Sequence, residues 1–235
     1  MSIINAQSLL QRIEYNRKSM PIEKKIKKII LNNVESVGAI ILYGSVIQNN
    51  YNNYNDIDVL VITKNRVWDK LWQKYKKIEE VREIAKAMGL NLDLQIIDKN
   101  LFYYQCSSNP SLIYQLKDSR TIYGKVRNQS KVEISKMNLR MKLDWSYVDN
   151  RVKDSNEIYQ AIRNTLLVRL LLNKIVDNGM LYQELINTLG INLLTRLKMN
   201  KASKLERKLA LEYLSDLNKK TEKEVLEAKW EKIVL

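Results

Sequence analysis

Residues 41–62 read ILYGSVIQNNYNNYNDIDVLVI, and this stretch decides the fold of the first half of the chain. An apolar run over 37–43 ends at Gly44-Ser45, and a second apolar run covers 57–62. Continuous apolar runs of about four to eight residues are typical of strands buried on both faces. We therefore predict two adjacent buried strands, joined by the polar, asparagine-rich segment between them.

The second strand carries two acidic residues at alternate positions, Asp56 and Asp58. Residues two apart in a strand point to the same side, about 6.5–7 Å from each other. Carboxylates held this close repel, and both stay ionised only if cations compensate them. A pair of divalent ions about 3.5–4 Å apart, shared with a triphosphate, is the usual use of such a pair. The pattern favours a metal-binding and catalytic role for both aspartates.

The first strand ends in residues suited to contact a phosphate. Gly44 has no side chain, so the backbone can approach an anion closely, and the Ser45 hydroxyl and nearby N–H groups can donate to it. The segment 46–55 is long enough for a short helix or loop that returns the chain to an adjacent strand. We predict that Gly44 and Ser45 bind nucleotide.

The chain contains no histidine. This excludes Ser-His and Cys-His nucleophilic catalysis, histidine-bound zinc and a histidine general base. Catalysis must then rest on carboxylates, lysines, tyrosines, hydroxyls or a metal with oxygen ligands. Mg²⁺ or Mn²⁺ is the cofactor that suits oxygen ligands.

The combination of an apolar strand, Gly-Ser, a spacer and Asp-Ile-Asp in a second apolar strand resembles the DNA polymerase beta superfamily of nucleotidyltransferases, in particular small prokaryotic or archaeal members with a C-terminal helical domain. The resemblance spans about residues 36–125. It implies a third carboxylate in a further strand, and Asp93 in LNLDLQII is at a fitting position. Alternatively, Asp93 is a solvent-facing acid of an edge strand.

The resemblance also implies a role for each site residue. Ser45 and the Gly44 backbone would hold the β- and γ-phosphates, and Asp56 and Asp58 would bind both metal ions. Asp93 would complete the second metal site and help to deprotonate the attacking hydroxyl. The reaction would transfer a nucleoside monophosphate from a nucleoside triphosphate to a hydroxyl acceptor and release pyrophosphate.

The sequence departs from the superfamily pattern in the residues that would neutralise the charge of the triphosphate. Small members of the superfamily often have basic residues directly after Gly-Ser, whereas this chain has Val46, Ile47 and Gln48. Basic residues elsewhere would have to meet the charge, and the candidates are Lys64, Lys99, Lys117 and Arg120.

The remaining periodicity predicts mostly helices. In the first half we expect helices over 4–19, 21–33, 66–88 (with Gly89 as its C-terminal stop) and 110–122, and a third strand over 90–97. From about residue 131 onward we expect no strand. Asp154 and Glu157 form a capping-box-like start to a helix over 155–176 that stops at Asn178-Gly179, and further helices cover 181–189 and 203–233.

These elements define an α+β protein. We predict a nucleotidyltransferase domain over residues 1–125, built on a small mixed β-sheet with flanking helices, and an all-α domain over 126–235. The apolar faces of helices 155–176 and 203–233 would pack against each other or against a second subunit, so a homodimer is possible.

Several aromatic residues allow two interpretations. Tyr51 and Tyr54 would stack on a base, or belong to an ordinary asparagine-rich turn, which we favour. For four further aromatic residues we expect packing within the core or between domains. They are Trp68, Trp72, Tyr103 and Tyr104.

Composition limits the partners and the compartment. The formal net charge of +14 favours a polyanionic partner such as nucleic acid or nucleotide phosphate. Alternatively, because the charge is spread along the chain, the protein is merely basic and well solvated. No apolar stretch is long enough to cross a membrane, and no signal peptide is expected. Cys106 is the only cysteine, so the chain cannot form an internal structural disulfide and a cytoplasmic location is expected.

Two classes of function remain open. In the first, the protein is an active enzyme whose acceptor is RNA, a protein or a small molecule. In the second, it is a non-catalytic, antitoxin-like protein that binds nucleic acid or a partner. A cluster of like charges costs stability unless a metal compensates it, which favours the enzyme.

Overall fold

The computed structural model describes residues 22–48, 56–126, 132–149 and 151–235. The described chain forms two compact units. One contains the described residues up to 104 together with 118–126, and the other contains residues 105–117 and the described residues from 132 onward. The predicted helix over 4–19 and the tyrosines Tyr51 and Tyr54 lie outside the described residues.

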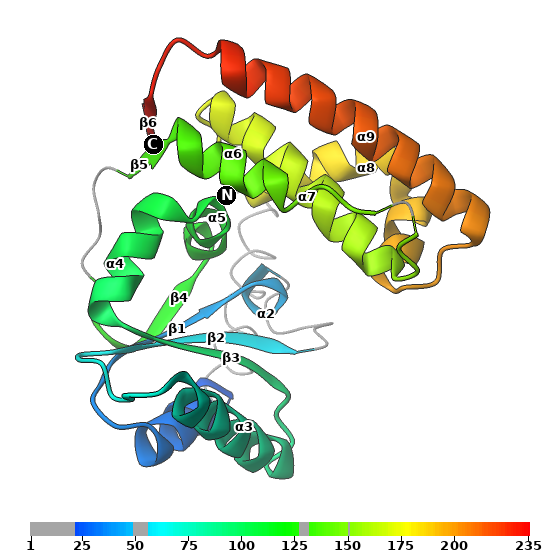
Figure 1. The fold of residues 1–235 in the computed structure, drawn as a ribbon. Coiled ribbons are helices and arrows are strands. Elements are labelled where there is room, and N and C mark those ends of the chain that lie inside the picture. Colours follow the sequence, from blue (N-terminus) through cyan, green and yellow to red (C-terminus); the bar gives the residue numbers. More distant parts are fainter. Residues whose placement is uncertain (1–21, 49–55, 127–131, 150) are drawn as a thin grey trace, which may run out of the picture. The chain divides into compact units, whose positions relative to one another are not determined.

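A four-stranded mixed sheet forms the centre of the first unit (Figure 1). Its strands are β1 (Val37–Tyr43), β2 (Ile57–Thr63), β3 (Leu92–Asp98) and β4 (Arg120–Gly124), in the order β3-β2-β1-β4. β1 pairs antiparallel with both β2 and β4, whereas β2 and β3 are parallel. The mixed sheet confirms the predicted α+β class, and the three strands predicted from the sequence are present.

Two helices share one core with this sheet. Residues 22–33 are helical, which confirms the second predicted helix, and α3 (Leu71–Ala87) follows β2. Ile26 and Ile30 from the first helix and Val81 from α3 are fully buried in the same cluster as alternate residues of β1, β2 and β3. Gly89 follows α3 with φ of +76°, as expected for a glycine that ends a helix.

Three short helices lie in the chain segments that connect the strands of the sheet. The four-residue α2 (Ser45–Gln48) begins directly after Gly44, and α4 (Lys99–Ser108) follows β3. The third, α5 (Pro110–Lys117), belongs to the second unit. Tyr114 in α5 is fully buried there, and its hydroxyl donates to the Ile175 carbonyl at 2.6 Å.

The second unit is mainly helical. It contains α6 (Lys136–Asp144), α7 (Ser155–Leu172), α8 (Asn178–Lys198) and α9 (Lys204–Glu227). Leucines and isoleucines of α7 occupy the middle of its core, and buried side chains of α6, α8 and α9 pack around them. Inside this core the Thr165 hydroxyl lies 2.6 Å from Asn218 Oδ1, and Asn218 Nδ2 donates to the Ser146 carbonyl at 3.0 Å. The predicted apolar faces of α7 and α9 thus share one core.

The prediction of one helix over 110–122 is wrong. α5 ends at Lys117, and residues from Arg120 form β4. Thr121, Ile122 and Tyr123 are residue types that favour strands, and the outer edge of β1 offers them a hydrogen-bonding partner.

The prediction that no strand follows residue 131 is also wrong. β5 (Glu133–Ser135) and β6 (Lys232–Val234) form an antiparallel pair, in which Ile134 lies opposite Ile233. Three-residue strands are too short to show an alternating pattern in the sequence. Because β6 uses the end of the chain, α9 stops at Glu227 instead of reaching residue 233.

The helix boundaries in the second unit also differ from the prediction between α7 and α8 and at the end of α8. Asp154 caps α7 as expected, since its side chain accepts from the Asn156 N–H at 2.8 Å. The helix ends at Leu172, before Asn178. Asp177 then caps α8 by accepting from the Met180 N–H at 2.8 Å, so Asn178 and Gly179 begin a helix. α8 continues to Lys198 past Gly190, whose φ of +70° is non-helical.

The prediction that aromatic side chains pack inside the protein is wrong for two residues. Trp72 and Tyr104 are 60% and 67% exposed, respectively. Trp68 packs half-buried against the sheet core, and the Tyr103 ring meets Phe102 edge-on with centroids 5.4 Å apart. The helix over 66–88 begins only at Leu71, so Trp68 precedes it.

The helices were also compared in length and polarity with membrane-spanning helices. Within the described residues, no helix combines the length and the apolar character that crossing a bilayer requires.

Candidate active site

Three strand positions bring the predicted site residues to one end of the sheet. In the antiparallel pair, Tyr43 at the end of β1 lies opposite Asp58 near the start of β2. In the parallel pair, Asp58 lies beside Asp93 of β3. Directly paired residues place their side chains on the same face of a sheet. Tyr43, Asp58 and Asp93 therefore share one face, and Asp56 lies just before the first residue of β2.

Gly44 lies directly against the Asp58 carboxylate. Its φ is +70°, in the left-handed region, and an added Cβ would overlap Asp58 Oδ2. Both the backbone conformation and the space therefore require glycine here. The Gly44 carbonyl accepts from the Ile47 N–H at 3.2 Å, which starts α2 at Ser45. The predicted phosphate-binding residues and the aspartates thus lie together.

The carboxylates of Asp56, Asp58 and Asp93 form a group of like negative charges. Burial, and then the charges of Asp56 and Asp93, raise the pKa of Asp58 from 3.8 to about 7. Asp56 and Asp93 both affect the pKa of Asp58, so each of them lies close enough to Asp58 to interact with it electrostatically. Like charges in this arrangement disfavour ionisation unless a cation is present.

Asp93 also has a cationic partner. Arg82 of α3 donates from Nη2 to Asp93 Oδ1 at 2.9 Å and from Nη1 to Glu79 Oε1 at 2.8 Å. Asp93 is partly exposed in this ion pair. The alternative prediction for Asp93 is not overturned: β3 is an edge strand of the sheet and Asp93 is partly exposed, although α3 gives its carboxylate a cationic partner. Neither composition nor spacing singled out Arg82, since the bond joins a helix to the strand that follows it.

Tyr43 is a second residue that the motif did not reveal. It is 2% exposed, and its pKa is raised first by burial and then by the charges of Asp58, Asp93 and Asp56. The Tyr43 hydroxyl therefore stays protonated and is influenced by all three carboxylates. Its place immediately before Gly-Ser at the end of a buried strand was the available signal.

The four basic residues that were predicted to neutralise the charge of the triphosphate do not all lie near the aspartates. Lys64 follows Thr63 and Lys99 follows Asp98, at the opposite ends of β2 and β3 from Asp58 and Asp93. At about 3.3 Å per residue, that separation is about 20 Å. The suggestion is therefore wrong for these two lysines.

Arg120 and Lys117 differ from those lysines. Arg120 pairs with Leu42 in the sheet, two residues before Gly44, and its Nε lies 3.2 Å from Glu23 Oε1. Of the three candidates in the first unit, Arg120 is therefore the one at the active-site end of the sheet. Lys117 belongs to the second unit.

The donor set of the site suits a hard divalent ion. Asp56, Asp58 and Asp93 offer only carboxylate oxygens, and the pKa of Asp58 is raised first by burial and then by the charges of the other two acids. In the described part of the chain, no three acidic or cysteine side chains already stand close enough to enclose a metal. Asp93 is turned to Arg82 instead. The site thus fits a metal by its chemistry, with Asp93 held by an internal cation.

Comparison with known proteins identifies this part of the chain. Residues 24–120 match the family described as "Polymerase beta, Nucleotidyltransferase". They form a polymerase beta-like nucleotidyltransferase domain. The match includes Gly44, Ser45, Asp56, Asp58 and Asp93, and it confirms the resemblance drawn from the motif.

Solved structures extend the likeness beyond the nucleotidyltransferase domain. The spectinomycin adenyltransferase AAD(9) from Enterococcus faecialis, determined with ATP and spectinomycin, is 17% identical with a TM-score of 0.54. The likeness covers 85% of this chain and 97% of AAD(9), so it includes helices after the nucleotidyltransferase domain. At this identity it concerns the fold alone.

A shorter likeness involves a toxin–antitoxin complex. A chain from the complex of tri-AMPylated Shewanella oneidensis HEPN toxin with MNT antitoxin is 22% identical, with a TM-score of 0.30. It covers 44% of this chain and 70% of that chain. The sequence matches none of the curated proteins with which it was compared.

Proposed function

We propose that the protein transfers a nucleoside monophosphate from a nucleoside triphosphate to a hydroxyl acceptor. The observation that carries this proposal is the contact of the Gly44 backbone with the Asp58 carboxylate, at the end of the sheet where Asp56 and Asp93 also lie. A phosphate-binding turn placed against a cluster of acids suits a triphosphate that arrives with divalent cations. The family match over residues 24–120 supports the same reaction class.

Each residue has a distinct task in this reaction. Asp56 and Asp58 would hold Mg²⁺ or Mn²⁺, which when bound neutralises charge on the phosphates. Ser45 and the Gly44 backbone would hold the β- and γ-phosphates. The acceptor oxygen forms a bond to the α-phosphorus while the bond from that phosphorus to the bridging oxygen breaks, so pyrophosphate leaves. Asp93 would take the hydroxyl proton, directly or through water.

The ion pair between Arg82 and Asp93 favours a second candidate. A guanidinium at 2.9 Å already neutralises Asp93, so the site would tolerate the absence of a second metal ion. A protein that binds a nucleotide or a partner without catalysing transfer would have this property. The cluster at Asp58 argues against it, because burying like charges costs stability that binding alone does not require.

Labelled triphosphates distinguish the two candidates. The protein is incubated with Mg²⁺ or Mn²⁺ and each triphosphate carrying label at the α- or the γ-phosphorus. Separate reactions contain total RNA, lysate protein or spectinomycin as acceptor. Nucleotidyl transfer puts α-label on an acceptor and releases γ-label as pyrophosphate, whereas kinase activity would transfer the γ-label.

Variants assign the activity to the site. Asp56→Asn/Asp58→Asn should abolish transfer and also the increase in melting temperature that Mg²⁺ and triphosphate together produce. Asp69→Asn/Asp144→Asn is the matched control, because both residues are exposed and the charge change is equal. If wild type binds triphosphate but transfers α-label to no acceptor, the binding protein is the correct candidate.

A further inference from the structure

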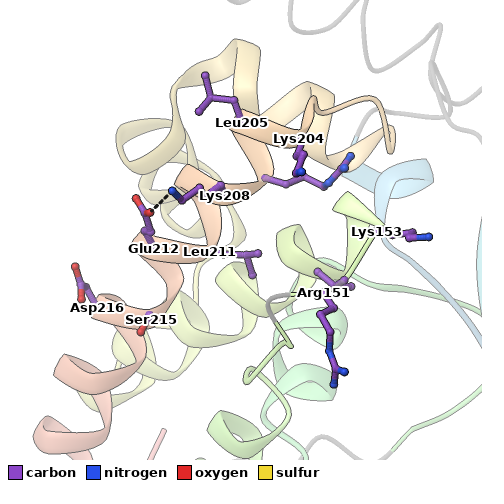
Figure 2. A pocket seen from close by; sticks show the side chains of 11 residues that line it. Arg151, Lys153, Lys204, Leu205, Lys208, Leu211, Glu212, Ser215 and Asp216 are labelled. Carbon is purple, nitrogen blue, oxygen red and sulfur yellow. Dashed lines mark ion pairs between the residues drawn. The ribbon is translucent and has the colours of Figure 1, made fainter.

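The helical unit contains a large basic groove outside the nucleotidyltransferase domain. It lies between residues 151–153 and the first half of α9, and has a volume of about 1400 Å³ (Figure 2). Five of the residues that line it are cationic, against the two acids Glu212 and Asp216. The cations are Arg151, Lys153, Lys204, Arg207 and Lys208. We call this site the α9 groove.

Most of these cations keep charge available for a ligand. In the described parts of the chain, neither Lys153 nor Lys204 forms an ion pair, and both are exposed. Lys208 lies 3.9 Å from Glu212 in a pair open to solvent, which is weak in water. Arg151 pairs with Asp149 of its own loop. The groove therefore has a surplus of positive charge that its own acids do not neutralise.

Arg207 differs because its position is fixed. Its Nη1 donates to the Ala202 carbonyl at 2.8 Å, which holds the half-buried guanidinium against the start of α9. A planar guanidinium held at one edge can still present other N–H groups to a phosphate. The groove thus combines one positioned arginine with flexible lysines.

Charge is distributed unevenly along the α9 groove. Figure 2 shows Lys204 near one end and Asp216 near the other, with Leu211 between α9 and the segment that carries Arg151 and Lys153. The acids lie one to three helical turns further along α9 than the lysines, so an anion would be attracted to the first part of the helix and repelled from Asp216. Leu205, at 67% exposure, adds apolar surface next to the lysines.

We propose that the α9 groove binds the phosphate backbone of a single nucleic acid strand. Its volume exceeds the roughly 300–1,000 Å³ of ordinary small-molecule pockets. Its cations come from two segments instead of converging on one point, which suits successive phosphates better than one small anion. Among the residues that the structure describes, none that lines the groove is aromatic, so binding rests on backbone charge with apolar contact to sugars and is independent of base sequence.

This proposal stands apart from the transfer reaction. The groove shares no residue with Gly44, Ser45 or the three aspartates, and it would bind a strand even if the nucleotidyltransferase domain transferred nothing. The Asp56→Asn/Asp58→Asn variant should therefore bind nucleic acid as wild type does, which separates failure of one proposal from failure of the other.

Fluorescence anisotropy with the full chain tests the groove. The probe is a labelled single-stranded RNA of about 20 nucleotides and mixed sequence, titrated at several salt concentrations. For a single strand, the logarithm of the binding constant falls with the logarithm of salt concentration by about 0.7 per phosphate contact. Lys153→Gln/Lys204→Gln/Lys208→Gln removes three contacts, so the slope should become shallower by about 2, with about 100-fold weaker binding at 0.1 M salt.

The control removes the same charge elsewhere. Lys219→Gln/Lys220→Gln/Lys229→Gln changes exposed lysines that do not line the groove. It should weaken binding less than about threefold, because long-range attraction is screened beyond about 10 Å at this salt concentration. Circular dichroism and melting temperature confirm that both triple variants are folded.

Three outcomes would overturn the proposal. The first is wild-type protein that does not bind the RNA at low salt. The second is an equal loss of affinity in both triple variants, which would show attraction by overall charge alone. The third is competition by polyglutamate or inorganic triphosphate at the same charge concentration that is as strong as competition by unlabelled RNA, since the groove would then bind acidic peptides or free phosphates.

Discussion

Arg82 Nη2 lies 2.9 Å from Asp93 Oδ1, so a helix outside the sheet holds the third carboxylate of the site. The same guanidinium binds Glu79 at 2.8 Å. Arg82 Nε is buried without a hydrogen-bond partner among the described residues, so this side chain is positioned at some cost. Such a charge-assisted hydrogen bond fixes the orientation of the carboxylate.

Arg82→Gln should lower the rate of transfer about 10- to 100-fold and raise the Mg²⁺ concentration needed for half-maximal activity, as is typical when a partner of a metal-binding acid is lost. Glu79→Gln is the matched control, because it removes the other partner of Arg82 at a position that is 65% exposed. Steady-state rates across a Mg²⁺ titration provide the measurement. Faster transfer by Arg82→Gln would instead mean that the guanidinium competes with metal for Asp93.

Gly44→Ala should abolish metal-dependent triphosphate binding and destabilise the protein. A left-handed backbone costs a non-glycine residue about 1–2 kcal/mol, and the new Cβ would also displace the Asp58 carboxylate. Gly89→Ala separates these effects, since Gly89 has a similar φ of +76° with no atom within 4 Å of an added Cβ. Urea denaturation and calorimetric titration of both variants are compared. Equal stability losses, with triphosphate binding retained, would remove the steric argument.

The parts of the site that could be predicted are those with a local cause. Asp56 and Asp58 are two residues apart at the start of an apolar run, and the structure keeps them close although Asp56 lies just before β2. Gly44 and Ser45 follow the preceding strand directly. Asp93 required the family resemblance, because parallel pairing of β2 with β3 is not visible in sequence spacing.

The features that were missed depend on contacts between distant segments. β4 exists because β1 offers a free edge, and so short a sequence alone did not distinguish a strand from the end of a helix. The exposure of Trp72 has a similar origin: periodicity shows that a helix has an apolar stripe, but not how far the sheet covers it. The Arg82–Asp93 pair likewise depends on how α3 packs beside β3.

Asp58→Asn should stabilise the metal-free protein at alkaline pH. The pKa of Asp58 is raised from 3.8 to about 7, so its contribution to stability is fully present below pH 3.8 and is lost as pH rises through 7. Removing the charge should increase the free energy of unfolding by about 1–2 kcal/mol at pH 8.5, after allowance for partial exposure, and by little at pH 4. Urea denaturation in EDTA measures this. Mg²⁺ and triphosphate should reverse the order by stabilising wild type alone.

Lys142→Met should stabilise the helical unit at neutral pH. Lys142 of α6 is 9% exposed, and burial followed by the charge of Arg163 lowers its pKa from 10.5 to about 8. Between these values the unfolded chain binds the extra proton, so wild-type stability should rise as pH increases from 8 to 10.5. The variant should lack this rise and gain about 2 kcal/mol at pH 7. Arg163→Met should shift the rise to higher pH, because it removes the neighbouring charge. Urea midpoints across this pH range test both variants, and an unchanged pH dependence in Lys142→Met would show that the ammonium group is well solvated.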